Sequence, residues 1–324
     1  MKLQQLRYIV AMVRHNLNVS QTADALYTSQ PGVSKQIRAL EDELGVELFE
    51  RRGKQVVRLT EAGERVVALA NEALNAVDAI RTAGREFANP HVGELAIATT
   101  HTQARYVLPP VIAGFREAYP HVSLRLHQGT PAQIAEMVLG GEADIAISTE
   151  GGALFGDLIQ LPCYRWNRSL LVPAGHPLQR LHALGELTLE ALSQYPIVTY
   201  TFGFTARSRL DTAFVERGLS ANVVLSASDV EVIRTYVALG LGVGIVATLA
   251  VPAHTPSDDT LVALDGSGLF EPSTTNVALA RGSRLRGYTY DLIERFAPHL
   301  VRETVDAALS GEAVSIDPTH LPLR

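Results

Sequence analysis

The sequence has little of what several classes of protein depend on. A single cysteine, Cys163, excludes an intrachain disulfide and a cysteine-based zinc cluster, and we expect a core or pocket-lining thiol rather than a nucleophile. No apolar run approaches the roughly 18–20 residues that a membrane span needs. The first residues lack the apolar segment and the cleavage site of a signal peptide. We therefore expect a cytoplasmic protein with no membrane partner.

Signatures of catalysis are equally scarce. The ten histidines are scattered, and neither a His-x-x-x-His or Cys-x-x-Cys spacing nor a Gly-x-Ser-x-Gly elbow occurs. The glycines of residues 240–244 lack the spacing of a dinucleotide-binding loop and follow a predicted helix, so we expect them to turn that helix into a strand. The sequence thus predicts no enzyme, no cofactor and no metal site.

What the chain does have is an uneven distribution of charge. The net charge is −6 at pH 7, yet residues 1–58 hold nine Lys and Arg against six Asp and Glu. The remaining residues hold 19 basic and 28 acidic side chains. A basic end on an acidic body predicts that the N-terminal part approaches phosphate groups, although a basic N-terminal segment is modest evidence alone.

The first sixty residues have the pattern of three short helices. Apolar residues at three- and four-residue spacing predict a helix over residues 3–13. A second helix follows from about Val19, with Ser20 as its expected N-cap. A third helix is predicted over residues 31–44, beginning at a proline and ended by Gly45 with positive φ.

The exposed face of the third helix predicts contact with DNA. Short polar groups in its first turns suit base edges in a major groove, and Lys and Arg suit phosphates. Residues 46–59 then predict two short strands around a basic turn, which together make a wing. We therefore expect residues 1–59 to form a winged helix-turn-helix that binds double-stranded promoter DNA. The expected contacts are Ser29, Gln30, Pro31, Ser34, Lys35, Arg38, Arg51, Arg52 and Lys54.

Residues 60–90 predict a long linker helix with Thr60 as N-cap. Its apolar residues form a narrow stripe, called the apolar seam below, and no neighbouring predicted element provides a hydrophobic core to bury it. A pairing helix from a second subunit is the simplest cover, and packing on the same chain is the alternative. The stripe consists of Val66, Leu69, Ala73, Val77 and Ile80.

From Glu94 onward, strand-like and helix-like runs alternate, which predicts βαβ units and a mainly parallel sheet. Ligands of such folds bind beyond the carboxyl ends of the strands. Hydroxyl-rich segments follow three predicted strands, at residues 99–103, 148–149 and 199–205, and Gly203 permits close approach of a ligand. They predict an anion site built from hydroxyls and helix N-termini, although each hydroxyl could instead be an ordinary helix cap.

The body alone would also suit a solute-binding protein of a transporter. The missing signal peptide and the predicted winged helix argue against that alternative. The tail, residues 310–324, matches no useful pattern, and we expect it to be poorly ordered.

The N-terminal motifs resemble those of LysR-type transcriptional regulators. They lie at residues 3–8, 22–23, 29–41, 48–51 and 59–63. Within that family, residues 97–106, 162–168 and 200–205 resemble the CysB-like branch, which controls cysteine biosynthesis and sulfur assimilation. A paralogous branch that controls sulfonate or taurine use remains the alternative.

The resemblance implies an α/β effector body of two Rossmann-like subdomains, like periplasmic binding proteins, over residues 91–324. Subdomain I would comprise about 91–163 and 268–309, and subdomain II about 164–267. It also implies a homodimer, commonly a homotetramer. The effector would be O-acetylserine or N-acetylserine, with sulfate or thiosulfate also able to bind. The implied effector residues are Thr100, Thr102, Gln103, Thr149 and Thr205, with Trp166 close by.

Overall fold

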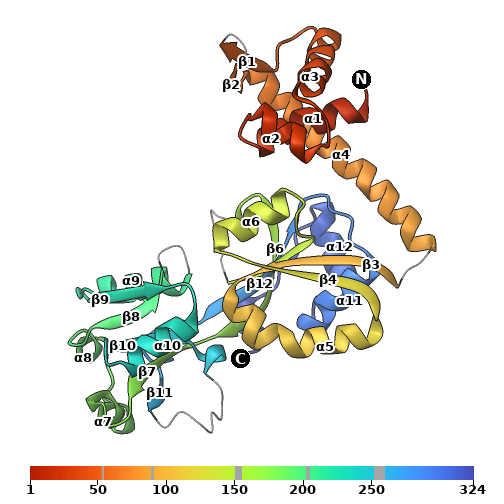
Figure 1. Ribbon diagram of the computed structural model, residues 1–324. Helices are drawn as coiled ribbons and strands as arrows, with labels where there is room; N and C mark the ends of the chain where they lie inside the picture. The colour runs from red at the N-terminus through yellow and green to blue at the C-terminus, as the bar shows by residue number, and fades with distance from the viewer. Residues whose placement is uncertain (53–54, 89–90, 150–154, 202–204, 252–259) are drawn as a thin grey trace. The chain divides into compact units, whose positions relative to one another are not determined.

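The computed structural model describes residues 1–52, 55–88, 91–149, 155–201, 205–251 and 260–324. The chain divides into two units, Met1–Ala88 and Asn89–Arg324 (Figure 1).

The first unit is a three-helix core with a two-stranded wing and a long helix. The antiparallel strands β1 and β2 form the wing. Ile9, Val33 and Leu40 are fully buried between the helices, as their helical spacing predicted. The elements are α1 (Leu3–Arg14), α2 (Val19–Ala25), α3 (Gln30–Leu44), β1 (Phe49–Arg52), β2 (Gln55–Leu59) and α4 (Glu61–Ala88).

The helix caps that the sequence predicted for this unit are present in the structure, with one exception. Gly45 ends α3 with φ of 71°, and Thr60 Oγ1 accepts a hydrogen bond from Gly63 N at 2.9 Å. The expected N-cap of α2, Ser20, was wrong. Asn18 caps this helix, because its Oδ1 accepts from the backbone N–H groups of Ser20 and Gln21.

The predicted apolar seam of α4 divides into two parts. Val66 and Ala73 pack against the core of the three-helix head, in which neighbouring α4 residues are buried. Leu69 and Ile80 are 56% and 73% exposed. The chain itself therefore covers part of the seam and leaves these two apolar side chains uncovered.

The second unit contains two five-stranded sheets, and each sheet with its helices is called a lobe (Figure 1). Lobe I has the strand order β4-β3-β5-β12-β6. Its strands are β3 (Val92–Thr99), β4 (His121–Gln128), β5 (Ile145–Ser148), β6 (Leu158–Trp166) and β12 (Ser273–Ala280). Its helices are the π-helix η1 (Gln103–Val107), α5 (Leu108–Ala118), α6 (Pro131–Leu139), α11 (Gly287–Phe296) and α12 (Arg302–Ser310).

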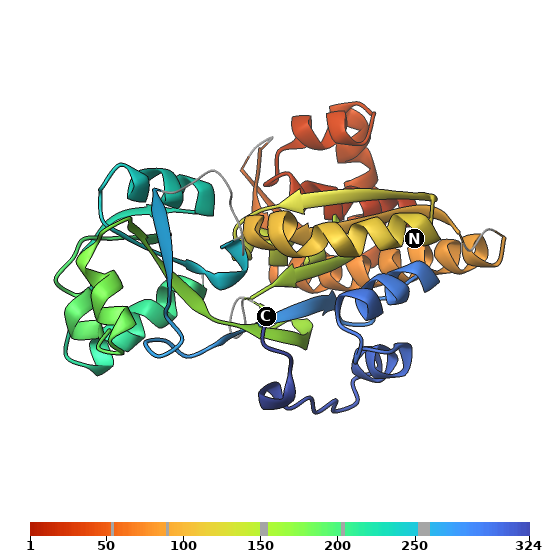
Figure 2. The same cartoon turned by 90° about the horizontal axis from the view of Figure 1, so that it is seen from below.

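Lobe II has the order β11-β7-β10-β8-β9, and Figure 2 shows its strands as a group separate from those of lobe I. Its strands are β7 (Arg168–Pro173), β8 (Ile197–Tyr200), β9 (Val223–Ala227), β10 (Val243–Ala247) and β11 (Leu261–Asp265). Its helices are α7 (Pro177–Ala183), α8 (Leu189–Leu192), α9 (Thr205–Glu216), α10 (Val230–Ala238) and the 3-10 turn η3 (Thr248–Ala250).

The prediction of a mainly parallel sheet was wrong, because each sheet is mixed. In lobe I, β3 pairs in parallel with β4 and β5, whereas β12 is antiparallel to β5 and β6. In lobe II, β8 is parallel to β9 and β10, whereas β7 is antiparallel to β10 and β11. The antiparallel strands β6, β7, β11 and β12 carry the chain from one lobe to the other and back, a non-local feature that local periodicity does not report.

The glycine-rich turn after α10 has the structural role that its spacing predicted. Gly240 has φ of 80°, and the chain then enters β10. A Cβ on Gly242 would lie 2.3 Å from the carbonyl oxygen of Pro196, so this close approach requires glycine.

The expectation of a poorly ordered tail was also wrong. Arg165 N donates to Pro322 O at 2.8 Å, and Arg324 N donates to Arg165 O at 2.9 Å. Leu321 is buried, and the Arg324 guanidinium lies 4.5 Å from the centroid of the Tyr164 ring. The tail therefore packs on lobe I through backbone pairing along β6 and through apolar side chains, since Val314 and Ile316 also pack against the core of lobe I.

The single cysteine is a core residue. Cys163 is 1% exposed, and burial raises the pKa of its thiol to about 12, so the reactive thiolate is suppressed. In the described part of the chain, no helix combines the length and apolarity needed to cross a membrane.

Candidate DNA-binding and effector-binding sites

The third helix of the head presents its expected DNA-contacting residues to solvent. Ser29 caps α3, and its Oγ accepts a hydrogen bond from Gly32 N at 3.3 Å. The opposite face of the helix is anchored by the buried side chains of the head core. One helix thus carries both a buried anchoring face and a free polar face. The residues exposed together are Ser29, Gln30, Pro31, Ser34, Lys35 and Arg38.

The wing residues that were expected to contact DNA differ in their surroundings. Arg51 forms an ion pair with the buried carboxylate of Glu41 at 2.6 Å. Glu41 Oε1 in turn accepts from the backbone N–H groups of Leu48 and Phe49, which anchors the start of the wing on α3. Arg51 therefore has a structural role, and its contact with DNA stays a prediction. Lys54 and the side chain of Arg52 lie outside the described residues.

The candidate effector site of lobe I lies where β3 and β5 end. These strands are parallel neighbours, so their carboxyl ends meet at one edge of the sheet. Thr99 Oγ1 donates to Ile147 O at 2.7 Å and ties the two ends together. The segment after β3 carries Thr100 and Gln103, both buried, and the segment after β5 carries the half-buried Thr149.

Two residues that the sequence did not single out as effector residues join this site. Tyr164 of β6 donates its phenolic hydrogen to Gln103 Oε1 at 2.5 Å. Gln103 Nε2 donates to Thr275 Oγ1 of β12 at 3.2 Å, and Thr275 Oγ1 lies 3.5 Å from Thr149 Oγ1. Tyr164 lay within a motif of the family resemblance, whereas Thr275 comes from a strand 172 residues beyond Gln103, and no local pattern connects the two.

Trp166 lies at the point where the chain leaves lobe I. It is 4% exposed, and its buried indole Nε1–H has no hydrogen-bond partner among the described residues. The Arg168 guanidinium lies 5.2 Å from the Trp166 ring centroid and donates to Glu271 O and to Ser273 Oγ. Arg168 thereby connects the two crossing segments, β6 to β7 and β11 to β12.

Lobe II contributes Tyr200 at the end of β8. This tyrosine is buried, its oxygen accepts from Ala247 N at 3.2 Å, and burial raises the pKa of its phenol. The side chain of Thr102, from lobe I, makes a hydrogen bond with Tyr200. Thr102 thus lies where the two lobes meet, while Gly203 and the side chain of Thr205 lie outside the described residues.

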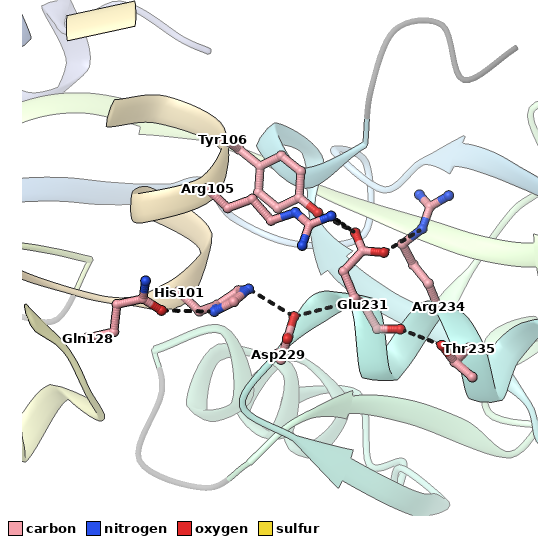
Figure 3. A network of polar contacts seen from close by, with 8 residues as sticks. All are labelled: His101, Arg105, Tyr106, Gln128, Asp229, Glu231, Arg234 and Thr235. Atoms are coloured by element: carbon pink, nitrogen blue, oxygen red, sulfur yellow. Dashed lines mark hydrogen bonds and ion pairs between the residues drawn. The ribbon is translucent and has the colours of Figure 1, made fainter. Parts of the chain in front are cut away.

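A second set of polar contacts joins the lobes beside the candidate site (Figure 3). His101 Nδ1 is 3.1 Å from Gln128 Oε1, and its Nε2 is 3.3 Å from Asp229 Oδ1 of lobe II. Asp229 also caps α10, because its side chain accepts from Glu231 N at 2.8 Å. The residue between Thr100 and Thr102 is therefore in contact with a helix terminus of the other lobe.

Glu231 receives the remaining contacts of this network. Tyr106 of η1 donates to Glu231 Oε1 at 2.5 Å, and Arg105 lies 3.6 Å from the same carboxylate (Figure 3). Burial, followed by the hydrogen bond to Glu231, raises the pKa of Tyr106, so the phenol stays a donor. The segment that runs from Thr100 into η1 is therefore held to α10 at several points.

Among the described residues, no group of three or more His, Cys, Asp or Glu side chains is placed to hold a metal ion. The polar groups that converge on the candidate site in lobe I are hydroxyls and an amide. Their chemistry is that of binding rather than of proton abstraction or nucleophilic attack.

The first unit is a winged helix-turn-helix, and the second is a two-lobed α/β domain with polar groups gathered where the lobes meet. This combination defines a DNA-binding regulator with a ligand-binding body. Residues 3–64 match the bacterial regulatory helix-turn-helix proteins of the lysR family, and residues 88–301 match the LysR substrate binding domain. The chain belongs to the LysR family of bacterial transcriptional regulators, which confirms the resemblance seen in its motifs.

The relatives include members of the CysB-like branch. The transcriptional regulator CysB of Haemophilus influenzae is 53% identical over 95% of this chain and 94% of that protein. The regulator SsuR of Burkholderia cenocepacia is 51% identical over 97% of this chain and all of that protein. The crystal structure of the cofactor-binding domain of the Cbl transcriptional regulator is 45% identical, with a TM-score of 0.63, and covers 67% of this chain and 93% of that one.

Proposed function

We propose that this LysR-type regulator controls genes of sulfur assimilation and cysteine biosynthesis in response to a small carboxylate or oxyanion bound at the lobe I edge. The effector is O-acetylserine or N-acetylserine, and sulfate or thiosulfate occupies the same site. The single observation that supports this best is the convergence of Gln103, Thr149 and Thr275 at the ends of β3, β5 and the adjoining β12. The near relatives named CysB favour the same pathway.

The composition of this site suits a carboxylate or a sulfate. Hydroxyl and amide groups donate hydrogen bonds without adding a full positive charge, so a small oxyanion can bind and leave. The unpartnered indole N–H of Trp166 is a further donor in the same strand as Tyr164. Its burial makes it costly to leave unsatisfied, which favours a ligand acceptor nearby.

The contacts between the lobes suggest how binding is transmitted. Thr102 contacts Tyr200, and His101 contacts Asp229, so the segment beside the effector is joined to lobe II at two consecutive residues. An effector that binds one arrangement of the lobes more tightly shifts the population toward that arrangement. We infer that this shift reaches the DNA-binding head through the long helix α4.

The uncovered part of α4 supports assembly into pairs. Leu69 and Ile80 leave apolar surface on a helix whose other side packs on the head. A second copy of α4 would cover them, which gives a homodimer with two heads and, by pairing of dimers, a homotetramer. Two heads on one DNA provide the several phosphate contacts that specific binding requires.

Control of sulfonate or taurine use is the second candidate function. The regulator SsuR of Burkholderia cenocepacia favours it. SsuR carries a name other than CysB, and its identity to this chain, 51%, is similar to the 53% of the Haemophilus influenzae CysB. The two candidates share the site and differ in the ligand.

The test is calorimetric titration of the full chain and its Thr102→Ala variant with both acetylserines, sulfate, thiosulfate and a sulfonate. We expect an acetylserine to bind the unaltered chain, and the variant to bind it about tenfold more weakly, because a hydrogen bond to an anion is lost. Thr212→Ala, an exposed threonine on α9, is the matched control and should bind normally. Unchanged affinity in Thr102→Ala would remove Thr102 from the site, and binding of the sulfonate alone would favour the second candidate.

A further inference from the structure

The buried side chain of Tyr164 contacts the amide of Gln103, a residue of the candidate effector site. We propose that Tyr164 is a specificity-determining residue. By holding Gln103 as a hydrogen-bond donor, it makes the site prefer fully deprotonated oxyanions such as sulfate over anions that keep an acidic hydroxyl, such as phosphate. This inference rests on the proposed function, because it takes the site to hold an oxyanion.

The distances assign the two ends of the Gln103 amide. Tyr164 Oη and Gln103 Oε1 are 2.5 Å apart, a separation found for O–H···O bonds and shorter than N–H···O bonds normally are. Gln103 Nε2 and Thr275 Oγ1 are 3.2 Å apart, which suits an N–H···O bond. The carbonyl therefore faces Tyr164 and the nitrogen faces Thr275. Turning the amide over would force nitrogen into the shorter contact.

Tyr164 keeps its proton and so remains a donor. Its side chain is fully buried, and burial raises the pKa of the phenol to about 12, although Thr275, Gln103 and Arg324 lower it in part. A protonated phenol donates to the carbonyl oxygen at any physiological pH. Gln103 itself is only 2% exposed, so water cannot take over the role of either partner.

The nitrogen end of the amide is the end nearer to the candidate site. Tyr164 belongs to the apolar core of lobe I, so the Gln103 carbonyl is turned toward that core. Thr275, the partner of the nitrogen, lies beside the half-buried Thr149 at the end of β5. An amide nitrogen carries two hydrogens, and Thr275 uses one of them. We infer that the second hydrogen is directed to the Thr149 side, since Thr149 Oγ1 lies 3.5 Å from Thr275 Oγ1.

A fixed donor at this position distinguishes two tetrahedral anions of similar size. Sulfate at neutral pH has acceptor oxygens on every side, whereas phosphate keeps at least one hydroxyl that must donate. A fixed N–H at this position removes one place at which that hydroxyl could find an acceptor, and a hydroxyl hydrogen left unpaired in a buried place costs binding free energy. An amide that can turn over offers its carbonyl to the hydroxyl and loses the discrimination.

The experiment measures sulfate and phosphate affinities of the full chain and its Tyr164→Phe variant by calorimetry at pH 7. Phosphate is also titrated in competition with bound sulfate. In the variant we expect the sulfate affinity to fall about tenfold and the phosphate affinity to change by less than about threefold, so the preference for sulfate decreases. An equal change for both anions, or no change for either, would overturn the proposal.

Tyr288→Phe is the matched control. Tyr288 is a buried tyrosine whose hydroxyl donates to Glu94 O at 2.7 Å, near the opposite end of β3. Its loss should leave the preference unchanged.

If Tyr164→Phe fails to fold, a second pair of variants tests whether the orientation of the Gln103 amide sets the preference for sulfate over phosphate. Thr275→Val removes the acceptor of the Gln103 nitrogen and should reduce the sulfate preference, whereas Thr275→Ser keeps the hydroxyl and should preserve it. Identical preferences in both would overturn the proposal. If the unaltered chain binds sulfate and no variant shifts the preference, this inference fails alone. If the unaltered chain binds neither oxyanions nor acetylserine, the proposed function fails with it.

Discussion

The expected DNA-binding face of the head and the candidate effector site of the body place polar side chains in opposite ways. On α3, residues such as Lys35 and Arg38 are exposed, and each can act independently of the others. In the body, Gln103, Tyr164 and Thr275 are buried and hydrogen-bonded to one another. Function and stability are therefore expected to be separable on α3, whereas in the body they depend on the same side chains.

This difference has a physical cause. A DNA backbone is a large polyanion that meets a protein surface, so long side chains can remain in water until they bind. A small anion is held only where donors surround it, which requires taking those donors out of water before the ligand arrives. Buried donors must then satisfy one another, and a network results.

The largest expected effect is that of Arg168→Met, which tests the buried side of the comparison. The substitution should lower the free energy of unfolding of the body by about 2–3 kcal/mol, because Glu271 O and Ser273 Oγ lose their donor and the Trp166 ring loses its stacking partner. Urea unfolding followed by the fluorescence of Trp166, the single tryptophan, measures it.

Arg209→Met is the control for this prediction. Arg209 lies 3.3 Å from the exposed carboxylate of Glu271, and an exposed ion pair contributes about 0–1 kcal/mol. Equal losses in the two variants would show that Arg168 does not connect the crossing segments in solution.

A smaller effect is expected on the exposed side, from Lys35→Ala. The variant should bind all DNA sequences more weakly and reduce the slope of log affinity against log salt by about one unit, because one phosphate contact is lost. Its unfolding free energy should change by less than about 0.5 kcal/mol. Binding assays at several salt concentrations measure the slope, and Arg217→Ala, an exposed arginine of lobe II, should leave it unaltered. An unaltered slope in Lys35→Ala would remove Lys35 from the phosphate contacts.

The smallest effect concerns His176. This residue is half-buried, so its environment is intermediate between the exposed side chains of α3 and the buried side chains of the candidate effector site. Its Nδ1 accepts from Leu178 N at 3.2 Å and caps α7, and burial lowers the pKa of the imidazole. Only the neutral ring can accept a hydrogen bond. The contribution of this cap to stability is therefore present above about pH 6.5, the pKa of an ordinary histidine, and is lost as the pH falls through the lowered pKa of His176 in the folded protein.

We therefore expect the unfolding free energy of the body to decrease on acidification, and His176→Asn to remove that part of the decrease. Asparagine is a good N-cap whose acceptor does not titrate, so helix α7 keeps its cap in the variant. Unfolding curves from pH 7.5 to 5.5 measure the difference. Parallel pH profiles for both proteins would show that His176 is not the titrating cap.

The head could be predicted almost entirely from the sequence because its contacts are local. The stripe of α1, the proline start and glycine end of α3 and the basic wing all follow from patterns a few residues long. The error at Ser20 was a shift of two positions, since Asn18 has the better acceptor for the first turn of α2. Arg51 showed the limit of such patterns, because its partner Glu41 lies ten residues away.

The body was predicted in part. Hydroxyl-rich segments after β3 and β5 were predicted to meet at one edge of the sheet, and they do, since parallel strands align their carboxyl ends. The antiparallel strands that cross between the lobes, and the ordered tail along β6, were not predictable from periodicity, which does not encode strand partners. The cross-lobe contacts of His101 and Tyr106 depend on that topology.

The sequence by itself determined the class of protein, the position of the third helix of the head and the segments that carry hydroxyls, because composition, caps and helical spacing are local properties of the chain. Only the tertiary structure decided that β12 brings Thr275 to Gln103, that Tyr164 orients the Gln103 amide, and that Arg168 joins both crossing segments. Those relations connect residues about 60 to 170 positions apart, and burial in a shared core is what brings them within hydrogen-bonding distance.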